Sequence, residues 1–151
     1  MTKPKHHTER GDLQTLLQRV SFLLRKYQLV EGFVNSHHGN SALAQSPIQK
    51  QNLEELQSLL DELHPADIAD ILEALPLTER LFIWNIVKAE YDGDVLLEAS
   101  DAVRETLITD MASTELVAAA EQLDADEIAD LAPDLPQDVI EDLFRLLPLD
   151  E

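Results

Sequence analysis

Two stretches of one pattern decide the fold: LHPADIADILEALP at residues 63–76 and LDADEIADLAPDLP at residues 123–136. When they are aligned, the same apolar and acidic positions coincide, namely Leu63 with Leu123, Ile68 with Ile128, Asp70 with Asp130 and Leu75 with Leu135. The second copy begins five steps of twelve positions after the first. The offset therefore indicates a short repeat that continues between them.

A twelve-residue step from Leu63 meets an apolar residue every time. These anchor positions are Leu63, Leu75, Val87, Ala99, Met111, Leu123, Leu135 and Leu147. Most anchors are followed by a turn-forming residue and then by an acid about four positions on, as in Leu75-Pro-Leu-Thr-Glu79. Residues such as Thr78 and Asp124 can cap a helix start, where the helix dipole also favours acids. The step predicts helix, tight turn, helix.

Helices of about two turns are unstable alone, because nucleation is costly, so each must bury its apolar face against neighbours. The sequence therefore predicts an all-α fold, an α-solenoid of short helices with about 12-residue repeats. The stretch Asp92-Gly93-Asp94 is typical of a turn between two longer helices. We expect helices at about residues 52–62, 65–74, 78–89, 94–98, 101–110, 113–122, 125–132 and 137–146.

The first third of the chain has a different composition. Residues 1–11 form a polar, basic tail that we expect to be disordered. Residues 12–34 carry leucines and other apolar residues at helical spacing, which predicts one long amphipathic helix. Residues 35–51 are rich in Ser, Asn, Gln and His and are expected to form a linker. The repeat domain then occupies residues 52–151.

The amphipathic helix has two possible roles. It can dock on the first repeat, since an open solenoid end needs a cap, or it can contact lipid through Arg19, Arg25 and Lys26.

Charge separates the two parts of the chain. Residues 1–50 contain 7 Lys and Arg against 3 Asp and Glu, whereas residues 51–151 contain 4 against 27, so the net charges are +4 and −23. Such an acidic domain repels nucleic acid and attracts cations or a basic partner. The chain has no cysteine and no apolar stretch long enough to cross a membrane, so we expect a soluble protein of a reducing compartment.

Residue patterns argue against an enzyme. Cysteine is absent, no G-x-S-x-G stretch occurs, and the glycines are scattered singly rather than gathered before a helix. We therefore expect a domain that binds or senses a ligand.

The candidate ligands for a metal are carboxylates on one helix face. Asp126 and Asp130 stand at i and i+4, outside the buried stripe marked by Ile128 and Leu131. Asp67 and Asp70 repeat the theme in the equivalent helix. Either this is a solvated acidic face, or it is half of a site for a hard divalent cation such as Mg²⁺, which needs only one or two carboxylates from each element.

The repeats, together with LPLTER at residues 75–80 and LFRLLPLDE at residues 143–151, resemble the cytosolic N-terminal domain of MgtE-type magnesium transporters over about residues 52–151. The resemblance implies a right-handed superhelix, followed in the full-length chain by CBS domains and a dimeric transmembrane pore. It also implies regulatory Mg²⁺ between the acidic domain and the CBS domains, with Asp126, Asp130 and Asp94 as ligands.

The same resemblance sets further expectations. The domain lies at the cytoplasmic face of the inner membrane in a homodimeric transporter. Alone it is a monomeric fragment that binds Mg²⁺ weakly and transports nothing. The alternative is a helical-repeat interaction module such as that of a flagellar motor switch protein, and a plain scaffold without an ion function is a third possibility. Pro133 is expected to end or kink the helix that carries Asp130.

Overall fold

The computed structural model of the chain describes residues 10–38 and 47–146, which form nine α-helices and two short 3-10 turns, without a strand among them. The predicted all-α class is therefore confirmed for these residues. The chain divides into two compact units, Met1–His64 and Pro65–Glu151.

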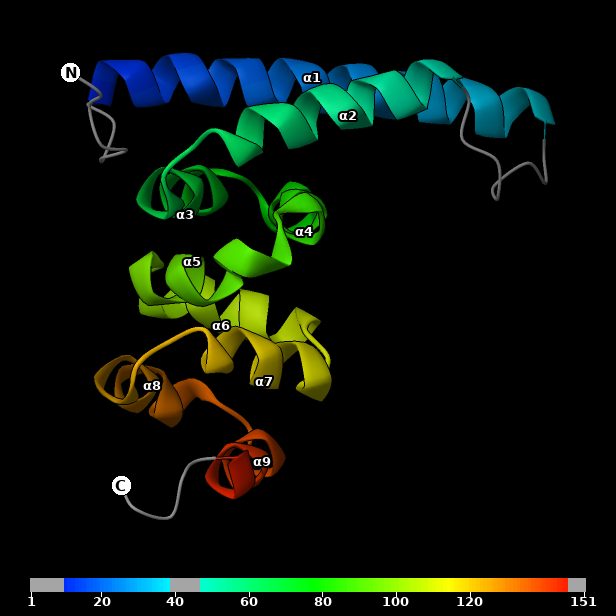
Figure 1. Cartoon of the computed structure of the whole chain (residues 1–151). Helices are drawn as coiled ribbons and strands as arrows, with labels where there is room; N and C mark the ends of the chain where they lie inside the picture. The colour runs from blue at the N-terminus through cyan, green and yellow to red at the C-terminus, as the bar shows by residue number, and fades with distance from the viewer. Residues whose placement is uncertain (1–9, 39–46, 147–151) are drawn as a thin grey trace. The chain divides into compact units, whose positions relative to one another are not determined.

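The first unit contains α1 (Arg10–His38) and α2 (Pro47–Asp61), which pack against each other (Figure 1). Side chains from both helices are buried, namely Val20, Leu23 and Leu24 of α1 and Leu56 and Leu60 of α2. Phe22, in contrast, leaves 64% of its surface exposed. The buried stripe has the helical spacing that the sequence shows.

Both helices differ in length from the sequence-based expectation. Helix α1 begins before residue 12 and ends after residue 34, and α2 begins at Pro47, inside the stretch assigned to a linker. Proline suits the first turn of a helix, because its missing N–H has no partner there anyway. The rest of the proposed tail and linker, residues 1–9 and 39–46, lies outside the described residues.

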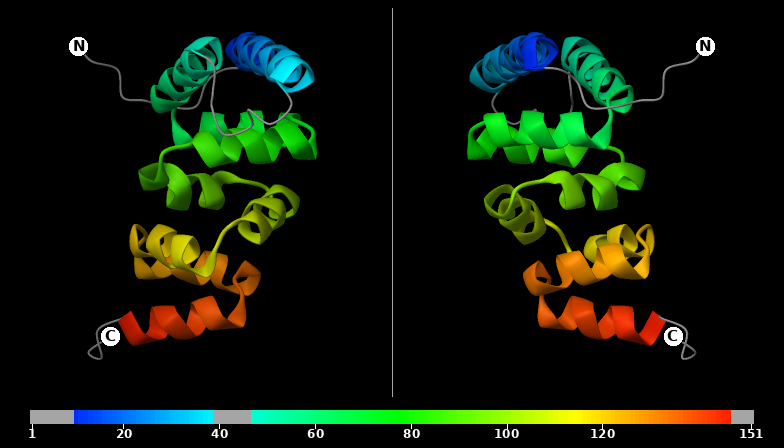
Figure 2. Two further views of the ribbon diagram at one scale, coloured as in Figure 1. Left: turned by 90° about the vertical axis from the view of Figure 1, so that its right-hand side faces the viewer. Right: turned by 90° about the vertical axis from the view of Figure 1, so that its left-hand side faces the viewer.

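The second unit consists of short helices that follow one another in chain order from α3 to α9 (Figure 2). They are α3 (Pro65–Ala74), α4 (Leu77–Ile86), the 3-10 turn η2 (Ala89–Tyr91), α5 (Asp92–Glu98), α6 (Asp101–Asp110), α7 (Ser113–Glu121), α8 (Ala125–Leu131), the 3-10 turn η3 (Ala132–Asp134) and α9 (Gln137–Leu146).

Helix ends in this unit fall on the twelve-residue anchors. The chain bends at Leu75, Val87, Ala99, Met111, Leu123 and Leu135, and every one except Met111 is buried. At each bend the anchor N–H donates to a carbonyl of the preceding turn, for example Leu75 to Leu72 at 3.3 Å and Leu123 to Ala120 at 3.0 Å. Each anchor thus ends one helix, and every anchor except Met111 places its side chain in the core.

Helices two positions apart in the chain pack against each other. The main pairs within the unit include α3 with α5, α4 with α6, α5 with α7 and α7 with α9, and α8 also packs on α5. Moving along the chain by two anchor steps therefore leads from one helix to the next helix but one, on which it packs. We call two anchor steps one repeat unit.

The stretch Asp92-Gly93-Asp94 is not the predicted turn: it is the first turn of α5, and the chain breaks earlier, at Val87 and Lys88. Acids in a first turn are favoured by the helix dipole, so the same composition suits a helix start. A side chain does not fit at Gly93, because a Cβ at this position would lie 2.7 Å from the carbonyl oxygen of Ala119 in α7. The glycine lets two helices approach closely.

Pro133 acts as the sequence predicted. Helix α8 ends at Leu131, and the proline lies in the 3-10 turn that follows. Its fixed φ and missing N–H prevent the α-helix from continuing.

Candidate metal-binding surface

Helix α8 carries two of the three predicted ligands and has a well-defined start. The Asp124 carboxylate accepts a hydrogen bond from the Glu127 N–H at 2.9 Å, and the Asp124 N–H donates to the Glu127 carboxylate at 3.0 Å. This reciprocal capping box satisfies two backbone donors that a helix start leaves free. Asp126 and Asp130 follow on this fixed helix, and both are exposed.

Asp94, the third predicted ligand, lies in the first turn of α5 and is also exposed. Because α5 packs against α8, the two helices that carry predicted ligands are neighbours. Within residues 10–38 and 47–146, however, no three or more His, Asp or Glu side chains converge as a metal site. The described part of the chain therefore offers separate carboxylates and not a complete coordination shell.

The supposed counterpart of this surface on α3 differs from it. Asp67 is only 2% exposed, so it is not a surface ligand of the kind proposed for Asp126. The repeat aligns Asp67 with Glu127 and Asp70 with Asp130, so Asp67 is not the counterpart of Asp126, and neighbouring elements decide which acids remain in contact with solvent.

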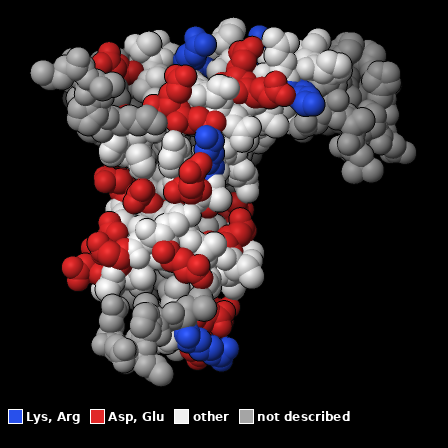
Figure 3. Space-filling model, in the orientation of Figure 1, with Lys and Arg blue, Asp and Glu red and all other residues white. Residues whose placement is uncertain are grey.

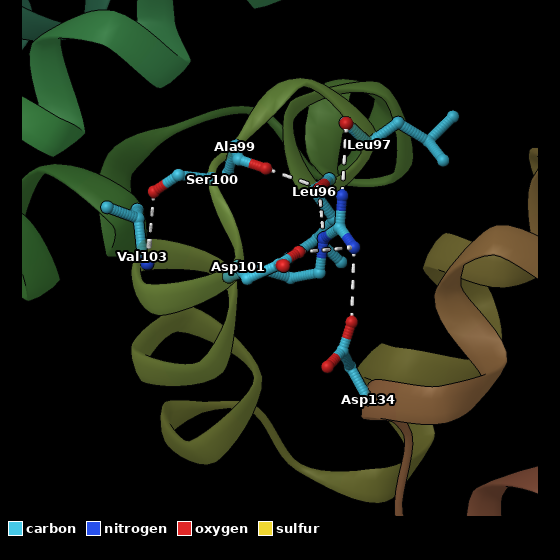
Figure 4. A network of polar contacts seen from close by, with 8 residues as sticks. Leu96, Leu97, Ala99, Ser100, Asp101, Val103 and Asp134 are labelled. Atoms are coloured by element: carbon cyan, nitrogen blue, oxygen red, sulfur yellow. Dashed lines mark hydrogen bonds and ion pairs between the residues drawn. The ribbon is translucent and has the colours of Figure 1, made fainter.

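An arginine side chain connects the end of α5 with the turn that follows α8, in the network of polar contacts that Figure 4 draws. Arg104 of α6 donates from Nε to the Leu96 carbonyl at 2.8 Å and from Nη2 to the carbonyls of Leu97 and Ala99 at 3.2 and 3.3 Å. Its Nη1 donates to Asp134 Oδ2 at 3.1 Å. One guanidinium thus satisfies carbonyls at the end of α5 and holds the turn that follows α8.

Arg80, one repeat unit earlier, makes two carbonyl contacts equivalent to those of Arg104. It donates to the carbonyls of Leu72 at 2.8 Å and Leu75 at 3.2 Å, and to the Thr106 hydroxyl at 3.3 Å. In both arginines Nε binds the carbonyl eight residues back and Nη2 the carbonyl five residues back. We call Arg80 and Arg104 the arginine clamps. The two arginines stand two anchor steps apart in the sequence, but nothing in the residue pattern alone indicated their contacts with carbonyls.

A polar pocket of about 170 Å³ lies between α4, η2, α5, α6 and α7 and is lined in part by Asp92, Asp110 and Glu115. Burial, followed by the negative charge of Glu115, raises the pKa of Asp92 from 3.8 to about 7. Asp110 accepts a hydrogen bond from the Asn85 amide at 3.1 Å. The sequence does not predict this pocket, because its acids come from three helices at no regular spacing.

Negative charge dominates the second unit. Subtracting the 7 basic and 7 acidic residues of positions 1–64 from the chain totals of 11 and 30 leaves 4 basic and 23 acidic residues in positions 65–151. Carboxylates are spread over the described part of this unit on the face in Figure 3. Two of the four basic residues are the arginine clamps, which are committed to backbone carbonyls. The surface is thus suited to cations.

These features define an all-helical, strongly acidic domain that presents carboxylates from short, internally clamped helices. The chain belongs to the MgtE intracellular N domain family, whose sequence model matches residues 63–151, beginning at the first anchor. It is thus the N-terminal region of a magnesium transporter of this type. A search of curated proteins found no match. Among the described helices, none combines the length and the apolar character needed to cross a membrane.

Proposed function

We propose that this chain is the cytosolic regulatory domain of an MgtE-type transporter and senses intracellular Mg²⁺ through carboxylates shared with CBS domains of the same full-length chain. The observation that carries the proposal is the exposed pair Asp126 and Asp130, one turn apart on a helix whose start is fixed by a capping box. The proposed role is regulatory and not catalytic.

The proposed architecture is a right-handed α-solenoid. Its support is the bend at every twelfth residue and the packing of helices two positions apart. Stacked short helices give a rigid scaffold, because each helix is held by neighbours on both sides. A rigid scaffold keeps surface carboxylates at fixed positions, which a site shared with another domain requires.

Magnesium fits the donors. Carboxylate oxygens are hard ligands, and Mg²⁺ retains several waters and takes one or two carboxylates from an element. Like charges one turn apart on a helix repel by a few tenths of a kcal/mol, which a cation offsets. Asp126, Asp130 and Asp94 would hold such an ion in part, and the CBS domains would supply the remaining ligands.

Gating follows from this shared site. When Mg²⁺ is abundant it screens the repulsion between two acidic surfaces, so the docked state, in which the pore is closed, is favoured. When Mg²⁺ is scarce the surfaces separate and the pore opens. In the homodimeric transporter the sensing domain would therefore act as a negative-feedback element at the cytoplasmic face of the inner membrane.

The first test is a Mg²⁺ titration of the chain at constant ionic strength, followed by backbone NMR shifts. We expect shifts centred on Asp126 and Asp130 that disappear in the Asp126→Asn/Asp130→Asn variant. The matched control is Asp101→Asn/Glu105→Gln, since these acids are also exposed and one turn apart, on α6. Uniform small shifts that Na⁺ reproduces, or equal loss in both variants, would leave only a solvated acidic face.

The second test uses the full-length transporter in vesicles. Removing the Asp126 and Asp130 charges should raise the Mg²⁺ concentration at which the pore closes, because Mg²⁺ then binds the docked state less tightly relative to the undocked state. An unchanged Mg²⁺ dependence, with the protein folded, would refute the assignment of these two residues.

A further inference from the structure

Helix α1 has an exposed face on which one aromatic side chain lies among three basic ones. Phe22 leaves 64% of its surface exposed. Arg19 precedes it by three positions, and Arg25 and Lys26 follow it by three and four, so the four residues share one side of the helix. The three basic residues are exposed as well. We call Arg19, Phe22, Arg25 and Lys26 the α1 patch.

The packing of α1 on α2 does not use the α1 patch. Helix α1 buries a different stripe, formed by Val20, Leu23 and Leu24, which are at most 3% exposed. A helix that only covers its neighbour needs one apolar stripe and carries polar residues on its remaining surface. A single exposed apolar side chain is common on proteins, but Phe22 coincides with a concentration of positive charge. Packing on α2 therefore leaves this face unexplained.

Positive charge is rare in this acidic chain, and it gathers on α1. The helix has four basic residues against two acids, Asp12 and Glu31, and no position between these two acids is acidic. The second unit, in contrast, has 4 basic and 23 acidic residues. A negatively charged surface is thus attracted to α1 and repelled by the second unit.

The three cations of the α1 patch are not equally free to bind such a surface. Arg19 borders a groove that Glu54 and Glu55 of α2 also line, so these carboxylates balance part of its charge. Arg25 and Lys26 do not line this groove. They are therefore the main positive charges beside the aromatic ring.

We propose that the α1 patch lies on the anionic lipid surface of the membrane that contains the transporter. Arg25 and Lys26 bind lipid phosphates, and the Phe22 ring inserts among the headgroups, where an apolar side chain next to cations is stabilised. The proposal rests on membership of the transporter family and is independent of Mg²⁺ binding by this chain.

The contact is weak by itself and gains strength from proximity. Each basic residue near an anionic lipid surface strengthens binding by about fivefold. Three cations and one aromatic ring are fewer than the signals that anchor a free protein stably. A domain that is joined to a membrane protein is always close to lipid, however, and this high effective concentration makes weak contacts sufficient.

Tryptophan fluorescence on vesicles tests the proposal. A cysteine placed before Met1 couples the chain to maleimide lipid and replaces the transporter as the tether, because the chain has no cysteine of its own. Phe22→Trp reports the environment of the α1 patch, and the native Trp84 is only 4% exposed and gives a constant background. EDTA is present so that divalent cations do not bridge carboxylates and lipid phosphates.

We expect a blue shift of the emission on vesicles of equal parts phosphatidylglycerol and phosphatidylcholine, and none on phosphatidylcholine alone. Raised salt should reverse the shift, because it screens the attraction. Arg25→Ala/Lys26→Ala should lower the ratio of bound to free patch about 25-fold, which is about fivefold for each cation. The matched control is Lys88→Ala/Arg145→Ala, which removes two exposed positive charges from the second unit and should leave the shift intact.

Four results would overturn the proposal. The emission could be the same on neutral and anionic vesicles, or the two double variants could lose the shift equally, which would indicate an effect of net charge alone. A shift that appears without vesicles as the protein concentration rises would indicate that a second copy covers the α1 patch. A shift produced by inorganic phosphate without vesicles would indicate a site for a free anion.

Discussion

Replacing Arg104 tests whether the arginine clamps hold the second unit together. The side chain is 11% exposed and donates four hydrogen bonds, three to carbonyls and one to Asp134. Hydrogen bonds from a charged donor contribute about 1.5–3 kcal/mol each when they are buried, but partly buried carbonyls regain water when the arginine is lost. We expect Arg104→Met to lower the free energy of unfolding by about 3 kcal/mol.

Two further substitutions separate the contributions. Asp134→Asn removes only the charge of a carboxylate that is 32% exposed, so it should cost about 0.5–1 kcal/mol. Arg104→Lys keeps the charge but not the planar fork, and one ammonium cannot reach the α5 carbonyls and Asp134 at the same time, so an intermediate cost of about 2 kcal/mol is expected.

Urea unfolding followed by circular dichroism measures these differences, and Arg145→Met is the control. Arg145 also pairs with an acid three residues away, Asp142 at 3.6 Å, but it is 77% exposed and should contribute less than about 0.5 kcal/mol. If Arg104→Met costs no more than Arg145→Met, the reasoning about the clamps is refuted.

Three other predictions follow from the packing. Gly93→Ala should lower the melting temperature by roughly 5 °C, because the clash with the Ala119 carbonyl outweighs the helix propensity gained, whereas Asp94→Ala in the same turn should change it little. Leu107→Ala removes a side chain with 0% exposure and should cost about 2–4 kcal/mol in denaturant unfolding. Since the pKa of Asp92 rises from 3.8 to about 7 on folding, the folded state binds the extra proton, so stability should fall as pH rises from about 4 to 7. Asp92→Asn should flatten this slope and stabilise the protein at pH 8, and an equal loss of stability at every pH would contradict it.

Much of the second unit was predictable, because its boundaries depend on a strict sequence interval. The bends at Leu75 and Leu123 follow directly from the anchors, and Pro133 ends the helix before it, one of the two effects expected of a proline. The helix expected over residues 78–89 was predicted too long, because α4 ends at Ile86 and the anchor Val87 forms the bend. Local chemistry and core burial agree at these positions, so a single sequence suffices to place them.

Other features needed three-dimensional neighbours. Asp92-Gly93-Asp94 has the composition of a turn, and only the proximity of Ala119 shows that the glycine makes room for a helix. The burial of Asp67 and the raised pKa of Asp92 likewise come from side chains far away in sequence. Of the candidate site, the exposure of Asp126 on a helix was predictable from the sequence. The further ligands that we propose in the CBS domains have no counterpart in this sequence.

The packing of each helix on those one to three positions away has a consequence for how the second unit folds. Its main contacts, such as α4 with α6 and α7 with α9, join residues that are close in sequence, so little loop-closure entropy opposes their formation. Folding should then be fast and able to start at any pair of helices and spread outward, and the length of the domain could change in evolution by whole repeat units without a new core.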